Sequence, residues 1–373
     1  MNIVYFSPIP YDFLMQRPQY LAAELSKLHK VTYIEPTISP IRWALKGGES
    51  PLTKSRQIKE NLNVVRLNGV LTAPHTLNAF DFGLNLQWEL GQLRNMFPSI
   101  DMVWIGYPGW WPLVSRLKYK RLVYDRMDNC SLMVSNKMLS KQLYKNDIEV
   151  MTNADCVFAS AKSLFDESSA INKHTYLIPN AVAEDFARNV VSAVTNRQQH
   201  MNLENDSAHG CRKKVFGYVG MIDSWFDIDA VAAIVESCKE HEIVLVGPNN
   251  ILKLKHPQVK YVGRVPKSEL PALICVFDVC LYPFKQNKLL DTINPVKIYE
   301  YLALNKPVLA VESKETRTFG DLVVRYNSYD KLTQLSIQQF LPPFASDETR
   351  NEFVADNKWS KRGKEILTVL NNL

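Results

Sequence analysis

NPVKIYEYLALNKPVLA, residues 294–310, contains the start of a helix, the end of that helix and the start of a strand. Pro295 suits the first turn of a helix, because the N–H that proline lacks would have no partner there. Asn305 can adopt the left-handed conformation that ends a helix, and Pro307 prevents the helix from continuing. Apolar runs lie on both sides, VCLYPF before the helix and VLAV after it. The segment therefore predicts a strand, a helix and a second strand in succession.

Two charged residues of the predicted helix are not needed for its folding. Lys297 and Glu300 are three positions apart, so their side chains lie on one face of the helix. Lys297 falls in the first turn, where a positive charge opposes the helix dipole. Local rules are broken in this way where an anion must be held. The alternative is a surface ion pair that stabilises the helix by about 0.2–0.5 kcal/mol.

The alternation of apolar runs and amphipathic stretches extends over the whole chain. The predicted strands of the first half are residues 3–7, 31–35, 64–67, 102–107, 122–125, 156–160 and 176–178. Those of the second half are residues 215–219, 243–246, 261–262 and 279–284, followed by the VLAV strand. Strands that alternate with helices indicate parallel sheets covered by helices. We therefore predict an α/β fold with two Rossmann-like domains.

The predicted domain boundaries follow from a change in composition. Residues 187–214 are polar and lose the apolar periodicity, which indicates a linker or a loop. We place an N-terminal domain at residues 1–190, the linker at 191–213 and a C-terminal domain at 214–348. Residues 349–373 have the pattern of a terminal helix. A chain of 373 residues is long enough for two such cores.

Composition argues against several classes of protein. The net charge of +6 is modest and the Lys and Arg residues are spread along the chain, so no nucleic-acid partner is expected. The 6 cysteines show no Cys-x-x-Cys spacing and no pairing with His, which predicts buried thiols, a reducing compartment and no metal or cofactor. The first residues, MNIVYFSPIP, have the pattern of a strand and not of a signal peptide. No apolar run approaches the about 20 residues of a membrane span, so we expect a cytoplasmic protein.

Three segments resemble those of one enzyme class. YDFLMQRPQYLAAEL (residues 11–25) is similar to a WDFLxQRPQ pattern, and GYVGMIDSWFDIDAV (residues 217–231) is similar to a GYxGxIxxWFD pattern. Residues 294–310 resemble the nucleotide-sugar signature of the GT-B glycosyltransferases, especially the bacterial group-4 type and the teichuronic acid and xanthan glucuronosyltransferase types. The resemblance implies two Rossmann-like domains facing a cleft, with the donor bound to the second domain and the acceptor to the first. It also implies that the terminal helix, residues 349–373, crosses back to the first domain.

The resemblance also implies roles for individual residues of the second domain. Glu300 would accept hydrogen bonds from the ribose hydroxyls of the donor, and Lys297 would neutralise its diphosphate, with Pro295 and Val296 beside them. Group-4 enzymes carry a further glutamate eight positions earlier, where this chain has Thr292. The other predicted donor contacts are Gly220, Gly247, Pro248, Tyr261 and Val262.

These other donor contacts all lie at or near strand ends, where ligands of open parallel sheets bind. Gly220 can let backbone N–H groups approach a phosphate, although a plain turn is the alternative. Gly247 and Pro248 follow the next strand, and the resemblance places them, together with Tyr261 and Val262, around the nucleobase.

The acceptor is expected to bind residues of the first domain. Asp125 and Asp128 lie at the end of a predicted strand. If transfer inverts the anomeric centre, one of them would take the proton of the acceptor hydroxyl as a general base; if transfer retains it, the pair would orient the acceptor. The alternative is a capping Asp and a surface Asp. Gln16 and Arg17 are expected at the mouth of the cleft, where Arg17 contacts phosphate or acceptor unless Asp12 holds it.

A group of tryptophans leaves two interpretations open. Trp104, Trp110 and Trp111 are followed by several Lys and Arg residues in GWWPLVSRLKYKRL. Aromatic residues beside cations can anchor a protein to a lipid surface. Core packing beside a solvated basic turn is the alternative.

Together these features predict a glycosyltransferase that moves a sugar from a nucleoside-diphosphate sugar, UDP-linked, to a saccharide or lipid-linked saccharide. The resemblance places it in bacterial surface polysaccharide synthesis (capsule or exopolysaccharide), with peripheral contact to the inner membrane. Thr292 keeps open the alternative of a non-catalytic nucleotide- or saccharide-binding protein of the same fold. A nicotinamide-dependent oxidoreductase is disfavoured, because FSPIPYD and not G-x-G-x-x-G follows the first strand.

Overall fold

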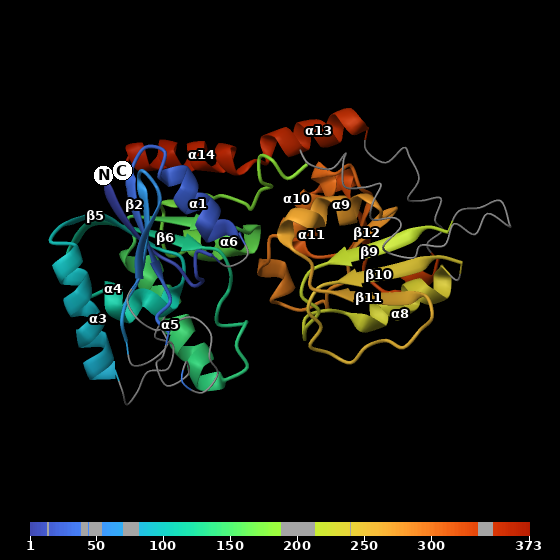
Figure 1. Ribbon diagram of the computed structural model, residues 1–373, viewed down its shortest axis with the longest axis horizontal. Helices are drawn as coiled ribbons and strands as arrows, with labels where there is room; N and C mark the ends of the chain where they lie inside the picture. The colour runs from blue at the N-terminus through green and yellow to red at the C-terminus, as the bar shows by residue number, and fades with distance from the viewer. Residues whose placement is uncertain are drawn as a thin grey trace. The chain divides into compact units, whose positions relative to one another are not determined.

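The computed structural model describes residues 1–12, 15–38, 44, 54–69, 82–187, 213–238, 240–334 and 346–373. The chain divides into two compact units, residues 1–179 with 362–373 and residues 180–361. Each unit contains one sheet with helices packed against it (Figure 1). The linker predicted at 191–213 lies outside the described residues except for Lys213.

The first unit is built on an eight-stranded sheet in the order β3-β4-β2-β1-β5-β6-β7-β8. Its strands are β1 (Asn2–Phe6), β2 (Lys30–Glu35), β3 (Lys54–Lys59), β4 (Leu62–Arg66), β5 (Ile100–Ile105), β6 (Tyr119–Arg126), β7 (Cys156–Ala159) and β8 (Thr175–Leu177). Its helices include α1 (Arg17–Leu25), α3 (Phe82–Met96), η1 (Pro108–Trp110), α4 (Trp111–Val114), α5 (Lys137–Asn153) and α6 (Lys162–Ser169). Every neighbouring strand pair is parallel except β3 and β4. The predicted parallel sheet is confirmed, and β3 is an unpredicted antiparallel edge strand.

Aromatic rings cross one face of this sheet from strand to strand. Tyr33, Tyr5 and Trp104 stack in series with ring centroids 5.5 Å apart, and Phe158 follows Trp104 at 5.4 Å. The indole N–H of Trp110 donates to the Ser7 carbonyl at 2.8 Å. These rings are buried, as is Trp111. The predicted tryptophan group therefore belongs to the core of the unit, and the lipid-anchor interpretation of it is wrong.

The second unit is built on a six-stranded parallel sheet in the order β11-β10-β9-β12-β13-β14. Its strands are β9 (Val215–Val219), β10 (Glu242–Val246), β11 (Val259–Gly263), β12 (Val279–Tyr282), β13 (Val308–Val311) and β14 (Val324–Tyr326). Its helices include α8 (Ile228–Ser237), η3 (Lys267–Glu269), α9 (Leu270–Cys275), η4 (Leu290–Thr292), α10 (Val296–Ala303), α11 (Lys314–Arg317), η5 (Gly320–Leu322), α12 (Tyr329–Gln334) and α13 (Asp347–Asp356). The order reverses between β9 and β12, which is the topological switch point where doubly wound sheets bind ligands.

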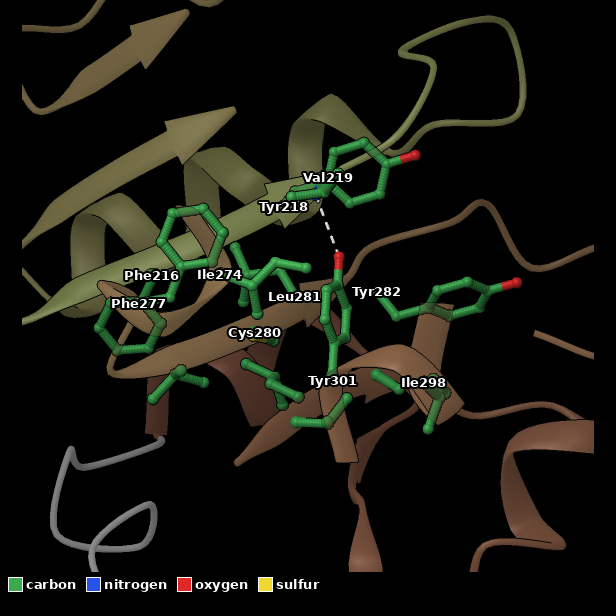
Figure 2. Packing of buried hydrophobic residues seen from close by; sticks show 14 of the residues in the cluster. Phe216, Tyr218, Val219, Ile274, Phe277, Cys280, Leu281, Tyr282, Ile298 and Tyr301 are labelled. Atoms are coloured by element: carbon green, nitrogen blue, oxygen red, sulfur yellow. Dashed lines mark hydrogen bonds between the residues drawn. The ribbon is translucent and has the colours of Figure 1, made fainter. Parts of the chain in front are cut away.

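The core of the second unit joins the end of β9 to helix α10 (Figure 2). The backbone N–H of Val219 donates to the Tyr301 hydroxyl at 3.0 Å. Phe277 packs against Gly217 so closely that a Cβ on Gly217 would lie 2.1 Å from its ring. Asn305 ends α10 with φ 58°, as the sequence predicts. The strand–helix–strand prediction from residues 294–310 is thus confirmed.

The C-terminal segment differs from the single predicted helix. Helix α13 ends at Asp356, and α14 (Trp359–Asn371) begins after a break at Asn357 and Lys358. The Asn357 carboxamide donates to the Phe353 carbonyl at 2.7 Å, which caps the end of α13. Residues 362–373, most of α14, belong to the first unit.

Candidate functional site

A buried polar network fixes the start of α10. The backbone N–H of Asn180 donates to the Asn294 side-chain oxygen at 2.9 Å, and the Asn180 carboxamide donates to the Asn294 carbonyl at 2.8 Å. The Asn294 carboxamide in turn donates to Glu315 at 2.8 Å. Pro295 is the N-cap residue and Val296 the first residue of α10. The backbone that carries Lys297 is therefore held by several hydrogen bonds.

Lys297 and Glu300 form the predicted pair on one face of α10. The Lys297 ammonium donates to Glu300 Oε2 at 2.7 Å. The Glu300 side chain is 6% exposed and that of Lys297 is 28% exposed, so the pair is more buried than an ordinary surface ion pair. A single hydrogen bond to a partly solvated ammonium leaves both groups able to exchange partners with a ligand.

Lys267, at the start of η3, adds a second cation that the sequence did not reveal. Burial lowers the pKa of Lys267, Glu300 acts to raise it, and Lys297 acts to lower it again. Asp185 also acts to raise it, so two ammonium groups and two carboxylates influence one another in this part of the second unit. Only a lysine after a proline marks the position in the sequence, which is too common a pattern to identify it.

The glycines after β9 and β10 pack against each other. Gly247 has φ 140°, and a Cβ there would lie 1.8 Å from the Gly220 carbonyl oxygen. The Gly220 N–H donates to the Val246 carbonyl at 2.9 Å, and the Ile222 N–H to the Pro248 carbonyl at 2.9 Å. The structure brings the two predicted loops together, but these N–H groups already have partners. Gly220 therefore does not offer its own N–H to a phosphate here.

Tyr261 and Val262 lie on the edge strand β11, which β10 separates from β9. The Tyr261 hydroxyl accepts the Leu254 N–H at 2.8 Å, and Lys253 Nζ lies 5.1 Å from the centre of its ring. Val262 is exposed. Tyr261 thus orders the chain before β11, and its predicted contact with a nucleobase stays a prediction.

Thr292, where group-4 enzymes carry glutamate, is buried. Its hydroxyl donates to the Leu289 carbonyl at 2.7 Å and stabilises the turn η4. The neighbouring Asp291 accepts the Lys314 N–H at 2.9 Å. Both side chains therefore serve the loop itself in this structure.

Arg17 and Asp125 form a buried ion pair in the first unit. Arg17 Nε donates to the two oxygens of Asp125 at 2.9 and 3.1 Å, and one terminal nitrogen donates at 2.7 Å. The other terminal nitrogen donates to the Ile178 carbonyl at 2.7 Å. The side chains are 3% and 0% exposed. Both side chains are thus enclosed and already hydrogen-bonded in this structure, and the predicted roles of Arg17 toward the acceptor and of Asp125 as a general base stay predictions.

Asp12, the alternative partner predicted for Arg17, is wrong. Asp12 instead accepts a hydrogen bond from Arg56 at 2.7 Å. Gln16 is exposed and precedes α1, and its backbone N–H donates to the Gln19 side chain at 3.0 Å. Its predicted contact with an acceptor stays a prediction.

Asp128 follows β6 and differs from Asp125 in its surroundings. Its side chain is partly exposed. Desolvation raises the pKa of Asp128 to about 7, with Arg17 opposing the shift and the Asp125 charge adding to it. A carboxylate with a pKa near neutrality can accept and release a proton at physiological pH. Of the two predicted carboxylates, Asp128 has the chemistry of a general base.

Comparison with known proteins establishes the fold. A sucrose-phosphate synthase from Thermosynechococcus elongatus superposes with a TM-score of 0.70 at 15% identity, covering 100% of this chain and 98% of that one. HepE of Anabaena, in complex with UDP and glucose, superposes with a TM-score of 0.69 at 13% identity, covering 100% of this chain and 99% of HepE. An α,α-trehalose 6-phosphate synthase from Burkholderia multivorans superposes with a TM-score of 0.68 at 12% identity, covering 100% of this chain and 98% of the synthase.

The chain has the GT-B fold. The chain is also similar to TuaH of Bacillus subtilis (strain 168), a protein named provisionally as a teichuronic acid biosynthesis glycosyltransferase. This similarity agrees with the resemblance that the three sequence segments show. It is 23% identical over 234 residues, which are 57% of this chain and 56% of TuaH. The match thus spans about half the length of that relative. No protein-family model matches the chain.

Among the described residues of this GT-B chain, no helix is both long and apolar enough to span a membrane. Within the same residues, no three His, Cys, Asp or Glu side chains gather as metal ligands.

Proposed function

We propose that the chain is a glycosyltransferase that uses a UDP-linked sugar. The observation that carries the proposal is the Lys297–Glu300 pair, held at the start of α10 with one hydrogen bond and partial exposure of the lysine. The GT-B fold and the similarity to HepE, whose structure contains UDP and glucose, support the donor class. A mere surface pair would not require the buried network that orders the α10 start.

In the proposed donor complex Glu300 accepts hydrogen bonds from the ribose hydroxyls. Lys297 then turns its ammonium to the diphosphate, where negative charge grows as the bond to the sugar breaks. A preorganised cation at that position stabilises the transition state more than the ground state. Lys267 adds a second cation to the same region. The proposal assigns charge neutralisation to these lysines and involves no metal.

Asp128 is proposed to face the acceptor. With a pKa of about 7 it is ionised above neutral pH and can take the proton of an acceptor hydroxyl as that oxygen attacks the anomeric carbon. In a transfer that retains configuration, the same carboxylate would orient the hydroxyl. Asp125 holds Arg17 in this proposal, and Asp128 is the carboxylate assigned to the acceptor hydroxyl.

The acceptor is proposed to be a saccharide or lipid-linked saccharide of a bacterial surface polysaccharide. The similarity to TuaH, named for teichuronic acid biosynthesis, supports this pathway. A lipid-linked acceptor requires the enzyme to work beside a membrane, and peripheral contact with the cytoplasmic face of the inner membrane is part of the proposal.

Helix α5 and the turn before it provide a surface for such contact. We define the α5 surface as the exposed residues Leu132, Met133, Lys137, Met138, Lys141, Tyr144 and Lys145. The three lysines follow one another at four-residue spacing along the helix, and large apolar side chains lie beside them. Exposed apolar groups next to cations suit the interface of an anionic bilayer.

Vesicle binding tests the α5 surface. The K137A/K141A/K145A variant is expected to lose binding to vesicles that contain phosphatidylglycerol, whereas K288A/K314A/K331A, which removes three exposed lysines of the second unit, is expected to retain it. Equal loss in both variants would show a general charge effect and would refute the assignment to α5.

A thermal-shift panel tests the donor. UDP-glucose, UDP-glucuronate, UDP-N-acetylglucosamine and GDP-mannose are compared at equal concentration, because a ligand of the native state raises the melting temperature by mass action. A UDP sugar is expected to stabilise the wild type and Lys288→Ala but not Lys297→Ala. Stabilisation by none of the UDP sugars would refute the proposal, and stabilisation without UDP release in the presence of any acceptor would favour the non-catalytic alternative.

A further inference from the structure

A pocket of about 530 Å³ opens in the second unit at the carboxyl ends of β12, β13 and β14. Ligand pockets in proteins range over about 300–1,000 Å³, so its size suits a small molecule. It is lined by Asp227, Lys285, Gln286, Val311, Tyr326, Asn327, Ser328, Tyr329 and Asp330. Lys297, Glu300 and Lys267 are absent from this lining, so the pocket is separate from the proposed donor contacts.

A buried hydroxyl in the wall of the pocket lacks a partner. Tyr326, the last residue of β14, is 3% exposed, and its hydroxyl makes no hydrogen bond to the described part of the chain. Buried polar groups are nearly always hydrogen-bonded. The hydroxyl oxygen is itself buried, so a ligand in the open pocket does not reach it, and the choice of ligand rests on the exposed lining groups.

A second tyrosine is fixed at the same wall. The Tyr329 hydroxyl donates to the Asp227 carboxylate, with 3.1 Å to each oxygen. Asp227 also accepts the N–H groups of Asp229 and Ala230, and so caps α8. The Tyr329 side chain, 47% exposed, is thus held in place and presents an apolar ring to the pocket.

The lining groups identify the class of ligand. Gln286, Asn327 and Ser328 supply both donors and acceptors. The charged residues of the lining are one cation, Lys285, and two carboxylates, Asp227 and Asp330. This balance disfavours phosphates and other anions. A sugar ring offers many hydroxyls for the polar groups and an apolar C–H face for the Tyr329 ring.

We propose that this pocket binds a neutral saccharide unit. The binding needs no transfer chemistry, so it does not depend on the proposed function. In a glycosyltransferase it would hold a saccharide independently of the donor residues.

An array of neutral, amino and anionic oligosaccharides tests the proposal on the full chain. Neutral glycans are expected to bind the wild type, and Asn327→Trp, which fills the pocket from an exposed position, is expected to weaken binding at least tenfold. Gln334→Trp, at the end of the following helix α12 and outside the lining, is the control and is expected to bind as the wild type does. Lys297→Ala is also expected to bind normally.

A second variant guards against local unfolding. Tyr329→Phe keeps the ring and removes the bond to Asp227, and it is expected to weaken binding while the melting temperature falls only slightly. The proposal is overturned if no neutral glycan binds, if anionic glycans bind better, or if Asn327→Trp binds as Gln334→Trp does. Loss of binding in Lys297→Ala would also overturn it, by placing the saccharide at the donor residues. Donor stabilisation in the thermal-shift panel is read separately, so either proposal can fail alone.

Discussion

Two ion pairs of this GT-B chain, Arg17–Asp125 and Lys297–Glu300, were both candidates for chemistry in the sequence, but their surroundings differ. Asp125 is fully enclosed and receives hydrogen bonds from two nitrogens of Arg17. Glu300 receives one from a lysine that is 28% exposed. A planar guanidinium binds a carboxylate through several bonds, whereas an ammonium acts as a point charge. Arg17–Asp125, with several hydrogen bonds and no solvent access, thus stabilises the fold. Lys297–Glu300, with one hydrogen bond and a partly exposed lysine, can bind a ligand instead.

The largest effect is expected from Asp125→Asn. The variant leaves the buried Arg17 charge without its counter-ion, and breaking a buried pair in this way costs about 3–5 kcal/mol of folding free energy. Urea unfolding followed by tryptophan fluorescence measures the loss, with Asp128→Asn as the control. A loss below about 1 kcal/mol would mean that Asp125 is as replaceable as a surface carboxylate and would remove the contrast between the two pairs.

Asp128→Asn is expected to act on rate and not to reduce stability. Loss of a general base lowers turnover about 10²–10³-fold. The wild-type rate should rise with pH through about 7, because the base must be ionised, and this rise should vanish in the variant. A wild-type rate that is flat from pH 6 to 8 would count against Asp128 as the base.

The same shift also predicts a change of stability with pH. Because the folded protein holds a proton on Asp128 between about pH 4 and 7 that the unfolded chain releases, the wild type loses stability as pH rises through this window. At pH 8 Asp128→Asn should therefore be more stable than the wild type. The expected gain is about 1–2 kcal/mol, because partial exposure lets solvent screen the charge.

Lys297→Ala should separate function from folding in the second unit. Without the cation near the leaving diphosphate, kcat/KM is expected to fall about a hundredfold, whereas the free energy of unfolding should change by less than about 1 kcal/mol because the pair is partly exposed. Steady-state kinetics and urea unfolding measure the two quantities, with Lys288→Ala as the matched control. Turnover equal to that of Lys288→Ala would remove Lys297 from the site.

The smallest effect is expected from Glu300→Gln. A neutral amide accepts weaker hydrogen bonds from the ribose, so donor affinity should fall about tenfold. Calorimetry with a UDP sugar and with its ribose-deoxy analogue sharpens this prediction. The wild type should bind the deoxy donor more weakly than the normal donor, whereas the variant should bind the two donors with nearly equal affinity. Equal losses in both proteins would show that Glu300 does not contact the ribose.

The sequence predicted the fold where the signals are local. The α10 region was predicted almost residue by residue, because Pro295, Asn305 and Pro307 act on their own backbone. Strand β3, with the sequence KSRQIK, was missed because a polar edge strand has no apolar pattern. The break between α13 and α14 was missed because it pairs with a residue far earlier in the chain: the Val182 N–H donates to the Asn357 carbonyl, and the Val182 carbonyl accepts the Trp359 N–H.

The candidate site was harder to predict because its partners are distant in the chain. Arg17 and Asp125 are 108 positions apart, and nothing in either segment indicates their bond. Asp128 acquires its raised pKa from burial, which the spacing of two aspartates does not show. Lys267 likewise gains its meaning only from its proximity in the fold to the charges on α10.

The bonds from Asn180 to Asn294 determine how the second unit should be dissected for study. Asn180 is the first residue of that unit. Two residues later, the Val182 N–H donates to the Asn357 carbonyl at 3.0 Å. A fragment that starts at residue 214, after the polar stretch, would lack both attachments and leave the α10 start without its anchor. An independently expressed second unit should therefore begin at Asn180 and include residue 361.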